Sequence, residues 1–156
     1  MQRISRDQMF MMIAEVVAMR STCRRLSVGA VIVDQRHNVV AVGYNGPPSG
    51  EPHCTGDACG IPYCTRAKHA EENALGRIML PYSTFALTMY VTASPCEHCW
   101  QKIIDRAVIG RVVFKNEYRI SQHLKVYCGI QVEKITASGY VTDFLTGHLV
   151  GGPEEA

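Results

Sequence analysis

Two short segments of the chain contain side chains that can bind a metal ion and move protons. The first includes His69 and Glu71, and the second includes Cys96 and Cys99 in a Cys-x-x-Cys spacing. That spacing lets two thiolates reach one ion from a single helical turn, and a histidine from a neighbouring element adds a third ligand. Three protein ligands leave a fourth position for water, as in catalytic zinc sites. The pattern therefore predicts a catalytic zinc bound by His69, Cys96 and Cys99.

Glu71 can provide the proton transfer that such a site needs. It lies two residues beyond His69, so its carboxylate can enter the same pocket without being a ligand. There it can take a proton from water and return it to the reacting molecule. Each part has a simpler explanation when taken alone, because Cys96 and Cys99 could be a redox pair or half of a zinc knuckle, and His69 a core histidine. The combination favours catalysis.

The order of hydrophobic patterns indicates which elements position these residues. We expect helices at residues 5–20, 68–80, 97–106 and 122–127, and strands at 28–34, 39–44, 86–92, 111–115 and 130–134. The first two strands form a hairpin, and the later strands alternate with helices. These features predict the α/β class, as a three-layer α/β/α sandwich with a mixed sheet of about five strands.

Length and composition limit the possible functions. With 156 residues the chain fits one domain, residues 1–156, with a core at about 5–133 and a loose tail at about 147–156. The formal charge of +2 gives no basic surface for nucleic acid. The most apolar early stretch, residues 9–19, is too short to cross a membrane and lacks a clear signal-peptide cleavage site. We therefore expect a cytoplasmic protein with no nucleic-acid or membrane partner.

The remaining cysteines suggest a second metal. Residues 45–65 form a long irregular segment that contains three cysteines, and a fourth precedes the first strand. A closed four-cysteine zinc site could hold such a loop, although unpaired or partly buried thiols are the simpler alternative. The candidate ligands are Cys23, Cys54, Cys59 and Cys64, with His53 as a possible replacement for one of them.

The H-x-E and P-C-x-x-C pair is the signature of zinc deaminases. Residues 21–50 (STCRRLSVGAVIVDQRHNVVAVGYNGPPSG) and 68–75 (KHAEENAL) resemble deoxycytidylate (dCMP) deaminases, with similarity over about Ser5–Val132. This resemblance implies a cytidine deaminase-like fold and conversion of dCMP to dUMP and ammonia. It also implies that Asn45 contacts the deoxyribose and that the Ala70 backbone contacts the base. The implied phosphate-side contacts are Arg25, Tyr118 and Arg119.

The resemblance further implies regulation. Typical members are homo-hexamers activated by dCTP and inhibited by dTTP, with effectors near Asn45 and Gly46 and a magnesium ion on the triphosphate. Some microbial and viral members have a second zinc, and Cys23 and Cys54 match their pattern. Two other functions stay open: a deaminase acting on another nucleotide, on tRNA or in riboflavin synthesis, and a non-catalytic, zinc-stabilised nucleotide-binding regulator.

Overall fold

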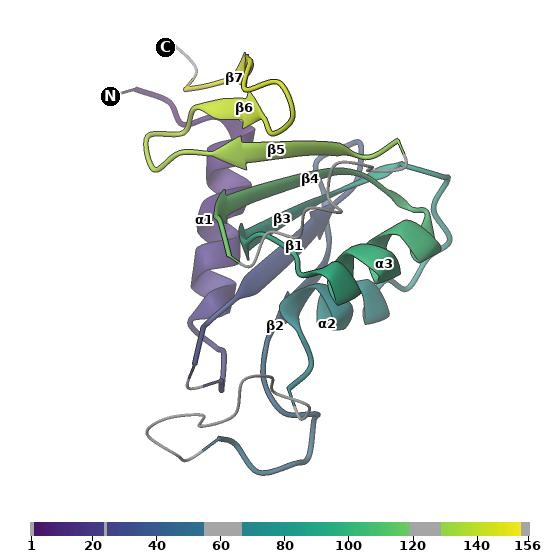
Figure 1. Ribbon diagram of the computed structural model, residues 1–156. Helices are drawn as coiled ribbons and strands as arrows, with labels where there is room; N and C mark the ends of the chain where they lie inside the picture. The colour runs from purple at the N-terminus through teal and green to yellow at the C-terminus, as the bar shows by residue number, and fades with distance from the viewer. Residues whose placement is uncertain (1, 24, 55–66, 119–128, 154–156) are drawn as a thin grey trace.

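A single mixed β-sheet forms the centre of the protein (Figure 1). The computed structural model describes residues 2–23, 25–54, 67–118 and 129–153. The strands run in the order β2-β1-β3-β4-β5-β6-β7 across the sheet. β3 pairs in parallel with β4, and β4 with β5, whereas the other neighbouring strands are antiparallel. The strands are β1 (Gly29–Val33), β2 (Val39–Tyr44), β3 (Leu87–Ala93), β4 (Ile109–Asn116), β5 (Gln131–Ile135), β6 (Val141–Asp143) and β7 (Leu149–Gly151).

Helices cover both faces of the sheet. Helix α1 (Arg6–Ala18) packs on one face, and α2 (Ala70–Gly76) and α3 (Glu97–Arg106) pack on the other (Figure 1). Because successive strand residues point to opposite faces, β1 contributes to both cores. Ile32 belongs to the core under α2 and α3, whereas Val31 and Val33 belong to the core under α1. The predicted three-layer α/β/α sandwich is therefore confirmed.

Gly43 lets α2 approach the sheet closely. A Cβ added at Gly43 in β2 would lie 2.4 Å from the carbonyl oxygen of Ala70 and 2.5 Å from the amide nitrogen of Ala74. Both distances are shorter than real Cβ contacts, so only glycine allows α2 to pack this closely against β2. Since α2 begins directly after His69, this contact sets the position of the metal-ligand segment.

The structure refines several expected boundaries. The predicted helix at 97–106 and strand at 39–44 have the same bounds as α3 and β2. The helix expected at 68–80 is shorter, because α2 ends at Gly76 and Met79 is 88% exposed. Within the described residues the sheet has seven strands rather than about five, because β6 and β7 extend it beyond β5, and β7 lies in the expected loose tail. The helix expected at 122–127 lies outside the described residues.

Within residues 2–23, 25–54, 67–118 and 129–153, every helix is too short or too polar to cross a lipid bilayer.

Candidate active site

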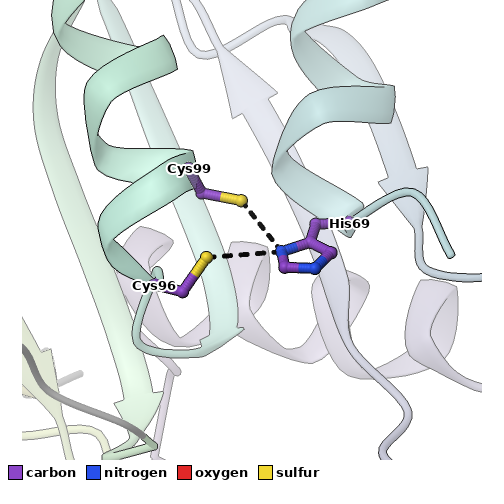
Figure 2. Close-up of side chains that lie close together, drawn as sticks. All are labelled: His69, Cys96 and Cys99. Atoms are coloured by element: carbon purple, nitrogen blue, oxygen red, sulfur yellow. Dashed lines mark hydrogen bonds between the residues drawn. The ribbon is translucent and has the colours of Figure 1, made fainter. Parts of the chain in front are cut away.

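The structure brings His69, Cys96 and Cys99 together between α2 and α3 (Figure 2). Nδ1 of His69 lies 3.1 Å from Sγ of Cys99 and 3.4 Å from Sγ of Cys96. The three potential ligand atoms lie within 4.8 Å of one another. A tetrahedral zinc with bonds of about 2.0 Å to nitrogen and 2.3 Å to sulfur would hold these atoms about 3.5 Å apart. The donor set and its spacing therefore fit zinc.

Local backbone structure positions these ligands. Cys96 is the N-cap residue of α3, and the Trp100 amide donates to its carbonyl oxygen over 2.9 Å. His69 is the N-cap residue of α2. It follows a short antiparallel bridge in which the Lys68 amide donates to the Gly46 carbonyl and the Gly46 amide donates to the Lys68 carbonyl. The ligands therefore stand at the starts of two helices that rest on the same sheet.

The two thiols have opposite tendencies to ionise. A hydrogen bond with Cys99 lowers the pKa of Cys96 to about 4, and His69 contributes in the same direction. The hydrogen bond to Cys96, together with burial, raises the pKa of Cys99 well above its usual range. Hydrogen bonding to Cys96 also raises the pKa of His69, against the effect of burial. A bound cation would favour both thiolates, because a coordinating thiol is deprotonated.

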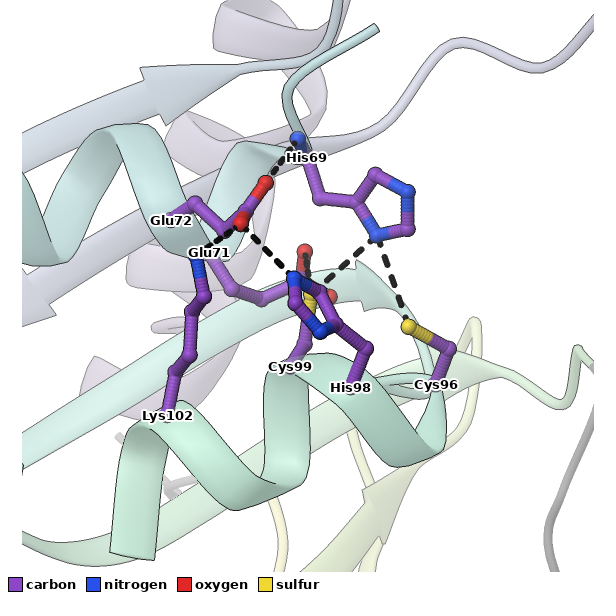
Figure 3. Close-up of polar contacts among 7 residues, drawn as sticks. All are labelled: His69, Glu71, Glu72, Cys96, His98, Cys99 and Lys102. Atoms are coloured by element: carbon purple, nitrogen blue, oxygen red, sulfur yellow. Dashed lines mark hydrogen bonds and ion pairs between the residues drawn. The ribbon is translucent and has the colours of Figure 1, made fainter. Parts of the chain in front are cut away.

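Glu71 lies beside the three ligand residues in the first turn of α2 (Figure 3). It is 4% exposed, and the Cys99 thiol donates to its Oε2 over 3.6 Å. Burial raises the pKa of Glu71 to about 7. The side chain is therefore a buried carboxyl group able to exchange protons near neutral pH.

Glu72 has a different set of contacts from its neighbour (Figure 3). Its Oε2 accepts the backbone N–H of His69 over 2.9 Å, and its Oε1 accepts from Lys102 and from His98. Burial favours the neutral acid, but hydrogen bonds from Lys102, His69 and His98 outweigh it and hold the pKa of Glu72 at about 2. Glu72 was not among the residues predicted from the sequence, although glutamate at the third helical position is a known capping signal.

A cavity of about 690 Å³ opens at this cluster. That volume is in the range of small-molecule sites. Among the residues expected to contact a nucleotide, four line the cavity: Arg25, Asn45, Ala70 and Tyr118. Arg119 lies outside the described residues. His69, Glu71 and Cys96 line the same cavity, so a ligand in it can reach the metal-ligand cluster.

Asn45 is buried, and its side chain forms hydrogen bonds with residues 21–28, some of which line the cavity. Its Oδ1 accepts from the Ser21 hydroxyl over 2.6 Å and from the Val28 amide over 2.8 Å. Its Nδ2 donates to the Leu26 carbonyl over 2.6 Å. Leu26 and Val28 line the cavity with Asn45 itself, so this side chain joins the end of β2 to the segment before β1.

Ser94 supports another part of the cavity wall and was not anticipated from the sequence. Its hydroxyl donates to the Tyr118 carbonyl over 2.9 Å and accepts from the Tyr118 amide over 2.8 Å. Both residues line the cavity, and Ser94 is 4% exposed. This two-way hydrogen bonding ties the chain after β4 to the end of β3. Its position directly before Pro95 and Cys96 is the only signal that the sequence offers.

The proposed second metal site is described only in part. Cys23 and Cys54 are partly buried, and His53 is exposed. Within the described part of the chain these residues do not form a three-ligand group, whereas His69, Cys96 and Cys99 do. Cys59 and Cys64 lie outside the described residues, so the four-cysteine site stays a prediction.

Comparison with known proteins gives concordant results. Residues 4–116 match the family described as "Cytidine and deoxycytidylate deaminase zinc-binding region". "ComE operon protein 2" of Bacillus subtilis is 37% identical over 151 residues, covering 92% of this chain and 78% of that protein. The deoxycytidylate deaminase of Saccharomyces cerevisiae is 37% identical over 134 residues, covering 78% of this chain, which spans only 41% of the yeast protein.

A solved structure shares the fold over most of its length. The dCMP deaminase of cyanophage S-TIM5, in complex with dCMP and dUMP, superposes with a TM-score of 0.66 and 32% identity. The match covers 82% of this chain and 95% of the phage chain. Sequence, fold and the His-Cys-Cys cluster agree, and the chain belongs to the cytidine and deoxycytidylate deaminase family.

Proposed function

We propose that this protein deaminates dCMP, converting dCMP and water to dUMP and ammonia. The observation that carries this proposal is the buried carboxyl group of Glu71 beside three zinc-type ligands, at the end of an open cavity. A purely structural zinc site uses four protein ligands. A three-ligand cluster with an adjacent uncoordinated carboxylate is instead suited to activating water.

His69, Cys96 and Cys99 would hold the zinc ion. A zinc ion in such a site lowers the pKa of bound water to about 7 and so supplies a nucleophile at neutral pH. Glu71 takes a proton from the attacking water. Its burial suits this role, because a carboxyl group with a pKa of about 7 can both accept and donate protons near neutral pH.

The same carboxyl group can serve both halves of the reaction. Glu71 passes the first proton to N3 of the pyrimidine as the water oxygen bonds to C4. The second water proton then goes by way of Glu71 to the exocyclic amine, the C4–N bond breaks, and ammonia leaves. The water oxygen becomes the carbonyl oxygen at C4 of dUMP, so atoms and charge balance without another reactant.

Residues along the cavity support a nucleotide as substrate. Arg25 lines it and offers a guanidinium group for phosphate, and Tyr118 can stack or hydrogen-bond. We assign Asn45 to the sugar, the Ala70 backbone to the base, and Arg119 to the phosphate side. The phage relative that contains dCMP and dUMP supports this choice of nucleotide.

Regulation and assembly form a further part of the proposal. On the family resemblance we propose a cytoplasmic homo-hexamer that dCTP activates and dTTP inhibits, with a magnesium ion on the effector and contacts at Asn45 and Gly46. We also propose a structural zinc bound by Cys23, Cys54, Cys59 and Cys64, or with His53 in place of one cysteine. The reduced thiols that both zinc sites require suit the cytoplasm.

The test is a comparison of substrates with purified, zinc-loaded enzyme. Ammonia release is measured from dCMP, CMP, dCTP and deoxycytidine, each with and without dCTP or dTTP as effector. We expect the highest kcat/KM for dCMP, activation by dCTP, and inhibition by dTTP that dCTP relieves. Higher kcat/KM for another substrate would overturn the assignment to dCMP, and simple competition by dTTP would overturn the separate effector site.

A further inference from the structure

We propose that Glu72 is a positioning residue that fixes His69 relative to Cys96 and Cys99 by joining α2 to α3. This inference rests on the proposed function for its relevance to catalysis, but not for its test. The two helices carry different parts of the metal site: His69 precedes α2, whereas Cys96 caps α3 and Cys99 lies in its first turn. Their relative position decides whether the three ligands can bind one ion.

One carboxylate contacts both sides of this junction (Figure 3). Oε2 of Glu72 accepts the backbone N–H of His69 over 2.9 Å. Oε1 accepts from the Lys102 ammonium group and from Nε2 of His98, which lies 3.1 Å away. His98 and Lys102 are four residues apart and therefore lie on the same face of α3. Glu72 thus links the backbone of one ligand to the helix that carries the other two.

Burial makes this link stronger than an ordinary surface ion pair. The Glu72 side chain is 14% exposed, although Lys102 is 46% exposed and His98 is 64% exposed. The carboxylate is thus shielded while its partners reach it from the solvent side. Charge-assisted hydrogen bonds are shorter and about twice as strong as neutral ones. Exposed pairs, by contrast, contribute little to stability, because water and salt screen them.

Packing on the sheet alone would leave the ligand geometry loosely defined. Ala70 and Ala74 of α2 and Trp100 and Ile103 of α3 belong to the same apolar core, which sets the approximate separation of the helices. Metal–ligand distances, however, need to agree within about 0.2 Å. A hydrogen-bonded bridge beside the ligands supplies the finer restraint that apolar contacts lack.

The neighbouring glutamates therefore have separate tasks. Adjacent helical residues point about 100° apart, so Glu71 and Glu72 cannot face the same group. Glu71 faces Cys99 in the buried cluster, and Glu72 faces His98 and Lys102 on α3. Glu71 is assigned to proton transfer. Glu72 is assigned to positioning His69 relative to the two cysteine ligands.

The experiment compares Glu72→Gln, Lys102→Met and the double variant with the full-length wild-type protein. The matched control is Asp105→Asn, which removes an exposed carboxylate on α3 that, among the described residues, accepts only a local hydrogen bond from Gln101. Zinc dissociation is followed with a chromogenic chelator, and the ligand field is followed by visible absorption after cobalt substitution. Neither readout requires turnover, so failure of the dCMP assignment would not alter them.

We expect Glu72→Gln to accelerate zinc loss by about 10-fold or more, the range found for residues that orient metal ligands. The cobalt spectrum should shift, and kcat for dCMP should fall more than KM rises, because the cavity lining is retained. Lys102→Met should act in the same direction, and the double variant should add little. Asp105→Asn should match the wild type in every measurement.

The proposal is overturned if Glu72→Gln lowers only the melting temperature and leaves the zinc dissociation rate and the cobalt spectrum unchanged. Equal effects of Asp105→Asn and Lys102→Met would also overturn it, because loss of any α3 charge would then suffice. If Glu72→Gln does not fold, Lys102→Met decides the question through the same two measurements.

Discussion

The close contact between Gly43 and α2 offers a sharp test of how the fold sets the active site. In Gly43→Ala the new Cβ would lie 2.4 Å from the Ala70 carbonyl oxygen, whereas an ordinary contact begins at 3.4 Å. The backbones of β2 and α2 would therefore have to separate by about 1 Å. His69 and Glu71 would move with α2, whereas Cys96 and Cys99 lie on α3.

The magnitude of the effect follows from that displacement. Overpacking of this kind destabilises a protein by about 1–3 kcal/mol. A misplacement of about 1 Å can reduce a catalytic rate by about 100-fold. We therefore expect Gly43→Ala to fold, to lose zinc faster, and to lower kcat for dCMP by about 100-fold. The measurements are steady-state kinetics, zinc dissociation and thermal unfolding.

Gly76→Ala is the matched control, because it changes a glycine to alanine in α2, the helix that Gly43 contacts. Apart from the helix's own backbone, no described residue lies within 4 Å of a Cβ at Gly76, and alanine favours helix by up to about 1 kcal/mol. This variant should have wild-type kcat and equal or greater stability. If Gly43→Ala had the kcat and the zinc dissociation rate of the wild type, the contact would not set the position of His69. The same conclusion would follow if Gly76→Ala lowered kcat and accelerated zinc loss as much as Gly43→Ala.

Three further predictions concern other parts of the molecule. Glu71→Gln should keep its zinc, measured by elemental analysis, while kcat falls by about 100-fold to 10,000-fold, because the proton carrier is lost; near-wild-type kcat would contradict the mechanism. Elemental analysis should find about two zinc ions per chain, and Cys54→Ser should remove one and lower the melting temperature, whereas one zinc in the wild type would exclude the structural site. Arg111→Met should destabilise the protein by about 3 kcal/mol at pH 7 in urea unfolding, because Asp7 and Glu133 lose their shared cation. That deficit should shrink as the pH falls, since both carboxylates become protonated; a constant deficit would contradict this assignment.

The folded-state pKa values of Asp7 and Glu133 determine how the destabilisation by Arg111→Met changes with pH. Burial raises the pKa of Asp7, but hydrogen bonds from Arg111 and Tyr90 outweigh it and leave the pKa below its usual value. Asp7 therefore stabilises the wild type above its unfolded pKa, and this contribution is lost as the pH falls through the folded pKa. Burial raises the pKa of Glu133, and Arg111 partly offsets that rise. Without Arg111 the pKa values of Asp7 and Glu133 both rise. The two carboxylates of the variant are therefore protonated at a higher pH, and its stability deficit shrinks there.

Local sequence patterns predicted α3, which carries two of the metal ligands, better than the strands β6 and β7 at one edge of the sheet. The helix at 97–106 has a defined start at Cys96 and an apolar face that includes Trp100 and Ile103, so its bounds agree with α3. The strands β6 and β7 contain three residues each, too few to show a period of two. They form by pairing onto β5 and onto each other, a non-local contact that local patterns do not reveal.

The shortened α2 shows a second limit of pattern analysis. Ile78 and Met79 extend the apolar spacing of 68–80, yet the chain leaves the helix at Arg77, where φ is −96° and ψ is 0°. Gly76 weakens the last turn, because glycine costs about 1 kcal/mol in a helix. Ile78 still packs against the core, but from outside the helix. Apolar spacing thus indicated burial at this position without indicating helical backbone.

Asn45 was identified by resemblance, and the structure shows that most of its hydrogen-bonding groups are used within the protein. Its Oδ1 accepts two hydrogen bonds, from Ser21 and Val28, and one N–H of Nδ2 donates to the Leu26 carbonyl. An amide oxygen has two lone pairs and an amide nitrogen has two N–H groups. Both lone pairs are thus occupied in these bonds, and among the contacts of the described residues the second N–H is the group left to face a ligand. If Asn45 contacts the deoxyribose as we propose, it must donate to a sugar hydroxyl oxygen rather than accept from that hydroxyl. The hydroxyl proton is then directed toward a different acceptor.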